Sequence, residues 1–359
     1  MHDICSVIAE YNPFHEGHRY HLMQAKKLTH AKYVAVILSS DFVQRGEPAV
    51  FSKFARARAA VHNGADIVFE LPVQYSCAPA WRFASGAVRI ADAIGSRWLS
   101  FGSESGGAGL EVPDEEDGGY RDRLKASLKE GNTFARALAS ASGEDLMPND
   151  ILAREYMRAI RKAGSGIIPV PVKRESSLHD GTGSALEIRN RIKNGEKYSF
   201  GEDFKEEIPV FTEDIFAPLM IKIRSLAPEI LSQHAEVGEG LENRIVSAAG
   251  KAKSYDELLF LVKSKRYPAS RIKRIFINIL LDITKDLDIK ADEEPAALRV
   301  LAVNKERKEI LSLLGGSGII TNPVSSELTA VRTTVRATDI YSVFRGGRSG
   351  EDMTNDIIV

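Results

Sequence analysis

Apolar runs and amphipathic segments alternate over the first 200 residues of the chain. Residues 4–9, 33–38 and 65–71 are apolar at nearly every position, which predicts strands buried on both faces of a parallel sheet. Residues 54–63 and 83–94 carry apolar positions at helical spacing, and a glycine follows each segment. Strands and helices that alternate in this way predict βαβ units, and hence an α/β fold with a doubly wound parallel sheet.

The same alternation continues further along the chain. Residues 98–101 predict a strand that runs into the glycine-rich stretch 102–109, and the acidic segment 110–119 predicts a solvated loop. Residues 167–172 predict another strand, whose prolines indicate the edge of a sheet. Residues 187–194 predict a short charged helix that ends at a glycine.

Helical patterns dominate from about residue 213 onwards. They cover residues 215–226, 241–249, 255–262 and 269–284. Residues 297–344 then mix one helix with short strand-like runs. Because polar, glycine-containing sequence at 200–212 separates the two textures, we expect an α/β domain over residues 1–205. We expect a mainly helical region, with a small mixed C-terminal segment, over residues 206–359.

The composition is that of an ordinary globular protein. Hydrophobic residues make up 43% of the chain and charged residues 27%, and the formal net charge is −1. Any binding of nucleic acid must therefore use a local patch. No run of 18 apolar residues occurs, and the first residues lack the pattern of a signal peptide. Cys5 and Cys77 are expected in the core, and we expect a cytoplasmic protein with no membrane partner.

The stretch that is most informative about chemistry follows the first predicted strand. His15 and His18 bracket Gly17 on a predicted exposed loop where strand gives way to helix, the position at which α/β folds bind ligands. Exposed amides and the helix dipole attract phosphate there, and a glycine permits close approach. The two imidazoles can donate hydrogen bonds to phosphate oxygens as charge builds on a leaving group. The arrangement resembles the signature of nucleotidyltransferases and class I aminoacyl-tRNA synthetases.

Other interpretations of these histidines stay open at this point. His15, His18 and His21 are three residues apart, so a zinc site is an alternative, although no cysteine or acidic cluster supplies a fourth ligand. His21 alone fits a packing residue, and His-x-Gly-His can also occur by chance. Its place after the first strand favours a phosphate-binding loop, and we expect no protein-bound metal.

Two later places can contact phosphate. Lys173 and Arg174 directly follow the strand at 167–172, and Ser184 and Arg189 lie at the start of a predicted helix. For the second place, a serine that only caps the helix is the simpler alternative. No Gly-x-x-x-x-Gly-Lys phosphate loop occurs in the chain.

A basic segment lies at residues 263–274 and contains no carboxylate. The apolar stripe of its helix indicates that Arg271 and Arg274 point outwards. In a chain of near-neutral charge, this segment predicts a contact with the phosphate backbone of RNA, and a solvated helix face is the alternative. The predicted tRNA-binding residues are Lys263, Lys265, Arg266, Arg271, Lys273 and Arg274.

Taken together, the motifs resemble those of one family, the bacterial tRNA(Met) cytidine acetate ligases. Residues 10–22 read Glu-Tyr-Asn-Pro-Phe-His-Glu-Gly-His-Arg-Tyr-His-Leu, and residues 42–49 read Phe-Val-Gln-Arg-Gly-Glu-Pro-Ala. Further matches occur at residues 63–66, 70–72, 101–104, 148–152, 265–267, 299–301, 304–305 and 337–341. The resemblance therefore spans nearly the whole chain.

The resemblance implies an enzyme that joins ATP and acetate into acetyl-adenylate and releases pyrophosphate. The acetyl group then passes to the exocyclic amine of the wobble cytidine of elongator tRNA(Met), without acetyl-CoA. It also implies that residues 1–205 form a nucleotidyltransferase-like catalytic domain, in which His15 and His18 are catalytic. Mg²⁺ is expected as a cofactor although the sequence does not reveal it, and no obligate protein partner is evident. The implied ATP contacts are Ile8, Ala9, Glu10, Tyr11, Asn12, Pro13, Phe14, His15, Glu16, Gly17, His18, Arg19, Tyr20, His21, Gly102, Asn149 and Arg174.

The chain departs from the family pattern at three positions. Asp41 and Asp150 stand where asparagine is usual, and Leu186 replaces a threonine, which leaves phosphate contacts by Ser184 and Arg189 the least supported. Two other functions stay open: an adenylyltransferase that acts on a small metabolite, and an RNA-binding protein with a vestigial nucleotide site. The basic segment argues against the first function, and the intact histidine pair argues against the second.

Overall fold

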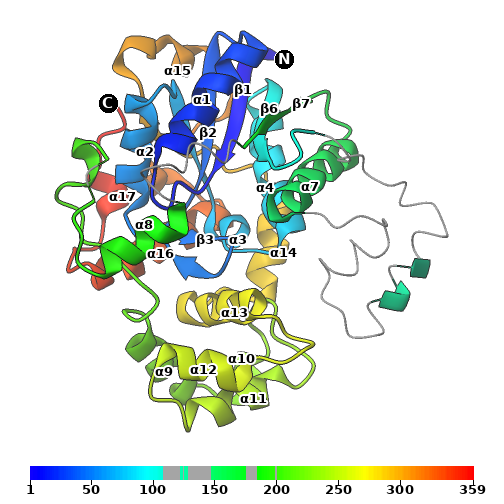
Figure 1. Cartoon of the computed structure of the whole chain (residues 1–359), viewed down its shortest axis with the longest axis vertical. Coiled ribbons are helices and arrows are strands. Elements are labelled where there is room, and N and C mark those ends of the chain that lie inside the picture. The colour runs from blue at the N-terminus through cyan, green and yellow to red at the C-terminus, as the bar shows by residue number, and fades with distance from the viewer. Residues whose placement is uncertain (108–121, 124, 128–146, 175–183, 199) are drawn as a thin grey trace.

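The computed structural model describes residues 1–107, 122–123, 125–127, 147–174, 184–198 and 200–359. The acidic segment 110–119, predicted as a loop, lies outside the described residues. An α/β part and a smaller helical part lie one above the other (Figure 1). No helix in the described ranges combines the length and apolar character needed to cross a membrane.

The centre of the α/β part is a mostly parallel sheet. Within the described ranges six strands form it, in the order β7, β6, β1, β2, β5, β8. The chain starts at β1, adds β2 and β5 on one side, and then adds β6 and β7 on the other. This confirms the predicted doubly wound sheet and places β7 at an edge. The strands are β1 (His2–Ala9), β2 (Tyr33–Ser39), β5 (Ile67–Leu71), β6 (Ser96–Ser103), β7 (Ile168–Lys173) and β8 (Val300–Val303).

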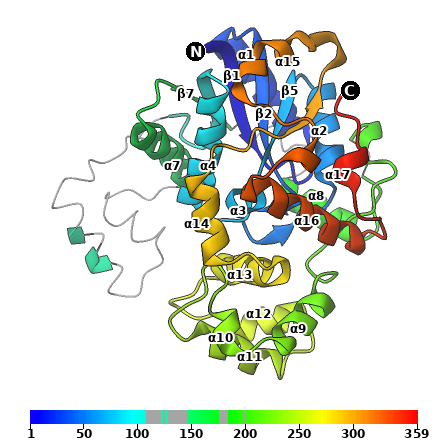
Figure 2. The ribbon, with the colours of Figure 1, turned by 180° about the vertical axis from the view of Figure 1, so that it is seen from behind.

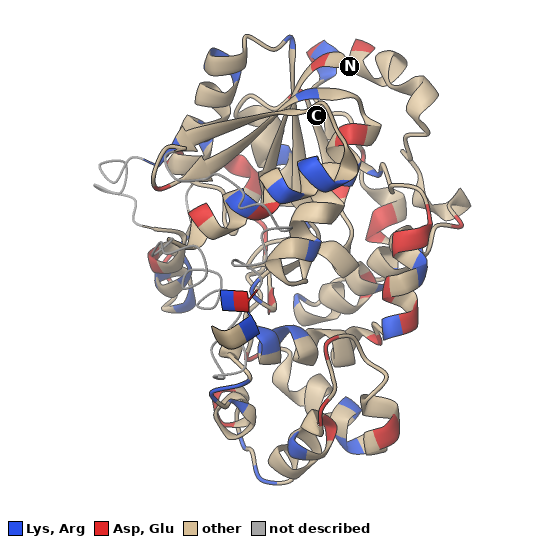
Figure 3. Ribbon diagram, turned by 90° about the vertical axis from the view of Figure 1, so that its right-hand side faces the viewer, with Lys and Arg blue, Asp and Glu red and all other residues tan. Residues whose placement is uncertain are grey.

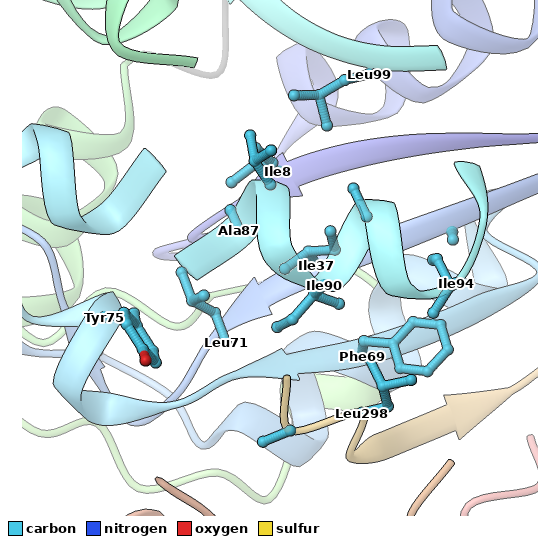
Figure 4. Close-up of a cluster of buried hydrophobic side chains, with 14 of the residues drawn as sticks. Ile8, Ile37, Phe69, Leu71, Tyr75, Ala87, Ile90, Ile94, Leu99 and Leu298 are labelled. Atoms are coloured by element: carbon cyan, nitrogen blue, oxygen red, sulfur yellow. The ribbon is translucent and has the colours of Figure 1, made fainter. Parts of the chain in front are cut away.

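Helices cover both faces of the sheet because successive side chains of a strand point to opposite sides. On β1, Ile4 and Ile8 pack in a core with α4 and α7, whereas Cys5 and Val7 pack in a second core with α1 and α2. Figure 4 shows Ile8 and Ile37 beside α4. Full burial of one such aliphatic side chain stabilises the fold by about 1.5–3 kcal/mol. The helices are α1 (Glu16–Thr29), α2 (Lys53–His62), α4 (Ala80–Ala93) and α7 (Pro148–Ala163).

Short elements surround the carboxyl end of the sheet. A two-stranded hairpin, β3 (Phe42–Val43) and β4 (Glu47–Pro48), follows β2, and α3 (Val73–Ser76) follows β5. Helix α8 (Ala185–Lys193) begins with a capping box in which Ser184 and Glu187 bond to each other's backbone. These elements lie between the sheet and the helical part (Figure 1).

The helical part packs around a further core, which also takes in Phe42 of the hairpin and Val73 of α3. Ile215, Leu258, Ile275 and Phe276 are fully buried in it. Helix α14 follows α13 along the chain and leads back towards the sheet (Figure 2). The helices are α9 (Phe216–Ser225), α10 (Pro228–Leu231), α11 (Leu241–Ala249), α12 (Tyr255–Val262), α13 (Ala269–Leu281) and α14 (Lys285–Glu293).

The end of the chain does not stay with the helical part. Strand β8 pairs antiparallel with β5, and Leu298 and Val300 are buried in the same core as Ile4. Residues 206–359 therefore do not form one structural unit, whereas the sequence analysis treated them as one region that follows the α/β domain. The reason is that β5 offers a free edge, and the apolar run at 298–303 satisfies its backbone groups. Three helices complete this return: α15 (Glu309–Leu313), α16 (Thr329–Phe344) and α17 (Glu351–Thr354).

Candidate active site

A pocket opens at the carboxyl ends of β1 and β6, the neighbouring strands at which the winding direction of the sheet switches. This is where a doubly wound sheet binds its ligand. Its lining combines imidazole, amide and cationic groups with a few apolar side chains. The lining residues are Ile8, His15, Gly17, His18, Tyr20, His21, Gly102, Asn149, Val172, Lys173 and Arg174.

His15 and His18 hold each other at the start of α1. His15 is the N-cap residue, and its Nδ1 accepts the backbone N–H of Gly17 at 3.1 Å. In return, His18 Nδ1 accepts the backbone N–H of His15 at 3.2 Å, and the two rings stack with centroids 3.8 Å apart. Because each Nδ1 is an acceptor, each neutral ring carries its proton on Nε2. Nε2 is therefore the atom that each ring can offer as a hydrogen-bond donor.

Two histidines of the pocket, His18 and His21, are kept neutral by their surroundings. Burial lowers the pKa of His18 well below its usual range, and the neighbouring His15, His21 and Arg174 act in the same direction. Burial, followed by the charge of Arg174, lowers the pKa of His21 to about 4. Neutral rings with protonated Nε2 can donate to an anion without carrying a charge that must first be desolvated.

The expectation that both histidines lie on an exposed loop was wrong. Only 5% of His15 is exposed, because its side chain belongs to the cap of α1. Gly17 is needed beside it, since a Cβ at this position would lie 2.9 Å from Cε1 of His15. Any larger residue would displace the ring.

His21 has a partner of its own on the sheet. Its Nε2 lies 3.0 Å from the hydroxyl of Ser100 on β6, a fully buried side chain. This bond directs the ring towards β6. In the part of the chain that the structure describes, no three His, Cys, Asp or Glu side chains come together as a metal site.

Gly102 lines the pocket from β6, and a hydrogen-bond network at the end of that strand holds Asn149. The Glu104 carboxylate accepts from the Asn149 side chain at 2.5 Å and from the Asp150 backbone at 3.1 Å. Asp150 accepts from the Ser103 hydroxyl at 2.5 Å and from the backbone of Glu104 at 3.1 Å. A carboxylate at position 150 is thus explained, because every group that it contacts there is a donor.

Lys173 and Arg174 supply the positive charge of the pocket. Lys173 is the last residue of β7. Its side-chain carbons pack on Gly106, because a Cβ at position 106 would lie 3.2 Å from the Cβ of Lys173. Arg174 follows it, and its backbone N–H is bonded to the carbonyl of Ser103 at 2.9 Å. Lys173 was singled out with Arg174 as a phosphate contact, but it was absent from the implied ATP contacts.

Eight of the implied ATP contacts do not line the pocket, and several of them shape the loop. Asn12 Oδ1 accepts the backbone N–H of Val50 at 2.8 Å, and Tyr11 packs edge-on against Phe14. Tyr198 donates to the carbonyl of Phe14. The eight are Ala9, Glu10, Tyr11, Asn12, Pro13, Phe14, Glu16 and Arg19.

Ser184 and Arg189 also lie outside the pocket lining. Ser184 caps α8, which is the role that the sequence analysis gave as the simpler alternative to a phosphate contact. Arg189 donates to the carbonyl of Asn12 at 2.8 Å, so it fixes the loop from outside. Leu186, at the third departure from the family pattern, is exposed.

Asp41, another departure, is buried beneath the hairpin. It accepts the backbone N–H of Lys53 at 2.7 Å and the hydroxyl of Thr338 at 2.9 Å. The carboxylate therefore caps α2 and links it to α16.

The basic segment is divided by its contacts. Lys263, Lys265 and Arg266 are exposed on the loop between α12 and α13. Arg271 stacks over Tyr267, with 5.1 Å between the guanidinium and the ring centroid. Basic and acidic residues are interspersed over the rest of the molecule (Figure 3).

The expectation that Arg274 points outwards was wrong. It is 7% exposed and forms two 2.7 Å hydrogen bonds with the carboxylate of Glu236. Lys273 pairs with Glu47 of the hairpin at 2.5 Å, and Arg266 pairs with Glu239 at 2.8 Å. The basic segment itself contains no carboxylate, but the folded chain places Glu47, Glu236 and Glu239 from other segments against it.

Sequence comparison gives the chain close relatives. The family model described as HIGH Nucleotidyl Transferase matches residues 2–355. A tRNA(Met) cytidine acetate ligase of Acetivibrio thermocellus is 34% identical, over 99% of both chains. One of Thermoanaerobacter sp. is 39% identical, over 86% of this chain and 85% of the other.

Structural comparison agrees with this. A crystal structure of Thermotoga maritima TmcAL without ligand superposes with a TM-score of 0.89 and 31% identity, over 100% of this chain and 99% of the other. A second structure of that protein, bound with alpha-thio ATP, superposes with a TM-score of 0.84 and 29% identity, over 99% and 97%. The chain therefore belongs to the HIGH nucleotidyl transferases and, among them, to the tRNA(Met) cytidine acetate ligase family.

Proposed function

We propose that this protein activates acetate with ATP and transfers the acetyl group to the wobble cytidine of elongator tRNA(Met). The observation that carries the proposal is the reciprocal cap of His15 and His18, which puts the proton of each neutral ring on Nε2 and places both rings in a pocket at the carboxyl end of the sheet. Similarity to a protein crystallised with an ATP analogue supports ATP as the nucleotide.

In the proposed first step, an oxygen of acetate attacks the α-phosphorus of ATP. A bond forms between that oxygen and phosphorus, the bond to the bridging oxygen of the β-phosphate breaks, and pyrophosphate leaves. His15 and His18 donate hydrogen bonds to the phosphate oxygens on which charge grows, a role in which one donor contributes about 10²–10³-fold to the rate. Lys173 and Arg174 attract the outer phosphates.

The pocket does not fit a magnesium site made by protein side chains. Mg²⁺ is usually held by one or two carboxylates in addition to substrate phosphates. The described lining residues contain no carboxylate, and Glu104 nearby is engaged by Asn149 and Asp150. No step above depends on a metal bound by the protein.

Acetate-dependent exchange of labelled pyrophosphate into ATP tests this first step. The purified protein should catalyse the exchange with acetate and without tRNA. An adenylyltransferase for a small metabolite would ignore acetate and require its own substrate. Exchange that does not respond to acetate would therefore overturn the proposal.

A further inference from the structure

Glu10 is a carboxylate beside the pocket that the proposed adenylation does not use. It follows β1, two residues beyond the lining residue Ile8, and it is only partly exposed. One oxygen, Oε1, accepts the backbone N–H of Gln44 at 2.9 Å. Across the described ranges, the other carboxylate oxygen has no hydrogen-bond partner. The group is thus held in place with one acceptor oxygen unused.

Three guanidinium groups act on this carboxylate electrostatically. Arg56 is fully buried and donates to the backbone carbonyl of Glu10 at 2.7 Å. Arg45 stands next to Gln44 at the tip of the hairpin, and its side chain is exposed. Burial raises the pKa of Glu10, and the Gln44 amide and the charges of Arg45, Arg189 and Arg56 oppose that rise without cancelling it.

The hairpin that carries Arg45 also touches the helical part. Gly46 lies against α13 so closely that a Cβ would be 2.3 Å from the backbone nitrogen of Arg274. Lys273 of α13 pairs with Glu47 of the same hairpin at 2.5 Å. Figure 1 shows β3 between the sheet and α13. Glu10 and Arg45 therefore lie where the proposed ATP pocket and the proposed tRNA-binding part meet.

The pair matches the base edge of cytosine. That edge presents an N4 amino donor next to two acceptors, N3 and O2. A carboxylate only accepts and a guanidinium only donates, so Glu10 suits N4 and Arg45 suits O2 or N3. Uracil presents a carbonyl where cytosine presents the amine, and a carboxylate would repel it.

We propose that Glu10 and Arg45 receive the edge of the cytidine that is acetylated, and that Glu10 takes the proton from its exocyclic amine. This inference rests on the proposed function. In the transfer step a bond forms between N4 and the acetyl carbon, and the bond from that carbon to the AMP oxygen breaks. AMP leaves with the electron pair, and the N4 proton passes to the Glu10 carboxylate.

The electrostatic surroundings of Glu10 agree with this task. The titratable groups that interact with it electrostatically are Arg45 of the hairpin, Arg56 of α2, Arg189 of α8, Tyr156 of α7 and Cys77 after α3. Burial keeps both Tyr156 and Cys77 protonated near neutral pH, because it raises the pKa of each. Glu10 is therefore the only carboxylate among these groups, and burial raises its pKa.

Glu10→Gln tests the inference, because glutamine keeps an acceptor for the Gln44 N–H but is no base. Transfer of labelled acetate to an elongator tRNA(Met) transcript should fall by about 10²–10⁴-fold, the usual contribution of a general base. Acetate-dependent pyrophosphate exchange should fall far less. The wild-type transfer rate should rise with pH and then level off, and the rising limb should disappear in the variant.

The outcomes separate this inference from the proposed function. Equal losses of transfer and exchange in Glu10→Gln would overturn the inference, since Glu10 would then serve the nucleotide loop. No exchange in the wild-type protein would overturn the proposed function and this inference with it. Retained transfer in the variant would also overturn the inference.

Arg45 is tested in the same two assays. Arg45→Ala should raise the KM for tRNA in the transfer assay more than it lowers exchange, and Arg45→Lys should restore part of the affinity. Arg97→Ala is a matched control, because Arg97 is exposed at the amino end of β6, the opposite edge of the sheet. An Arg45→Ala variant that behaves like the control would remove Arg45 from the proposal.

Discussion

At the scale of single residues, each nitrogen of the two stacked histidines has a separate task. Nδ1 of His15 and Nδ1 of His18 accept backbone N–H groups at the start of α1. This leaves Nε2 as the donor of each ring. Each of the two side chains thus has a structural role through Nδ1 and a proposed chemical role through Nε2, and suitable substitutions can separate the two roles.

Substitution of His15 separates capping from catalysis. His15→Ala removes both the cap and the Nε2 donor, whereas His15→Asn keeps an acceptor at the N-cap position. Both variants should lose about 10²–10³-fold in pyrophosphate exchange. Only His15→Ala should also lose about 0.5–2 kcal/mol of unfolding free energy in urea titrations. Near-normal exchange by His15→Asn would contradict the assigned role, and His18→Ala should lose exchange to a similar extent.

The histidines also predict how stability depends on pH. The pKa of His21 falls from 6.5 to about 4 in the folded protein, so the unfolded chain binds a proton that the native state excludes. The free energy of unfolding should therefore decrease as pH falls from 6.5 towards 4. His21→Asn should show a shallower decrease than the wild type in urea titrations over this range. Identical slopes would show that His21 does not carry the effect.

At the scale of elements, the strands and most helices could be predicted because their apolar spacing is strong. The loop at His15 was found because glycine and histidine stand at a strand-to-helix junction. The cap itself could not be predicted, since histidine is not a usual N-cap residue. The burial of Arg274 was missed because its partner, Glu236, comes from a distant segment. The pairing of β8 with β5 was missed because the two strands are more than 200 residues apart in sequence.

Among the predicted tRNA-binding residues, those at the start of the basic segment are exposed, and we propose that they make the contact. Replacing Lys263, Lys265 and Arg266 together by glutamine should weaken binding of elongator tRNA(Met), and the loss should shrink as salt rises. Each phosphate contact contributes about one unit to the slope of log K against log salt. Filter binding over a range of salt measures this, with pyrophosphate exchange as the control. An unchanged slope would leave these residues as a solvated surface.

Arg274 should behave differently from these exposed residues. Arg274→Ala leaves the Glu236 carboxylate without its bidentate partner, so it should cost about 1–3 kcal/mol of unfolding free energy. Urea unfolding of this variant beside Lys265→Ala measures the difference. A variant as stable as Lys265→Ala would show that the pair adds nothing to the fold.

At the scale of the whole molecule, a buried ion cluster ties the end of the chain to the sheet. Lys53 of α2 is fully buried and lies 2.7 Å from Glu70 of β5 and 2.9 Å from Asp352 of α17. The Arg299 guanidinium donates to the Asp352 carbonyl at 2.9 Å. The α/β part thus depends on residues from both ends of the chain.

Asp352→Ala tests that dependence. It leaves buried positive charge on Lys53 and Arg299 with too little compensation, so it should cost about 3–5 kcal/mol of unfolding free energy. Asp356→Ala, at an exposed position nearby, is the control and should change stability little. Equal stability of the two variants in urea would show that the cluster does not hold the C-terminal segment.

The most direct measurement incubates the purified protein with ATP, labelled acetate and an elongator tRNA(Met) transcript, followed by nuclease digestion and mass spectrometry of the nucleosides. The account predicts N4-acetylcytidine at the wobble position, with one AMP and one pyrophosphate released for each acetyl group. Acetyl-CoA should not replace acetate and ATP. Consumption of ATP and acetate without acetylated cytidine, or acetylation that requires acetyl-CoA, would contradict it.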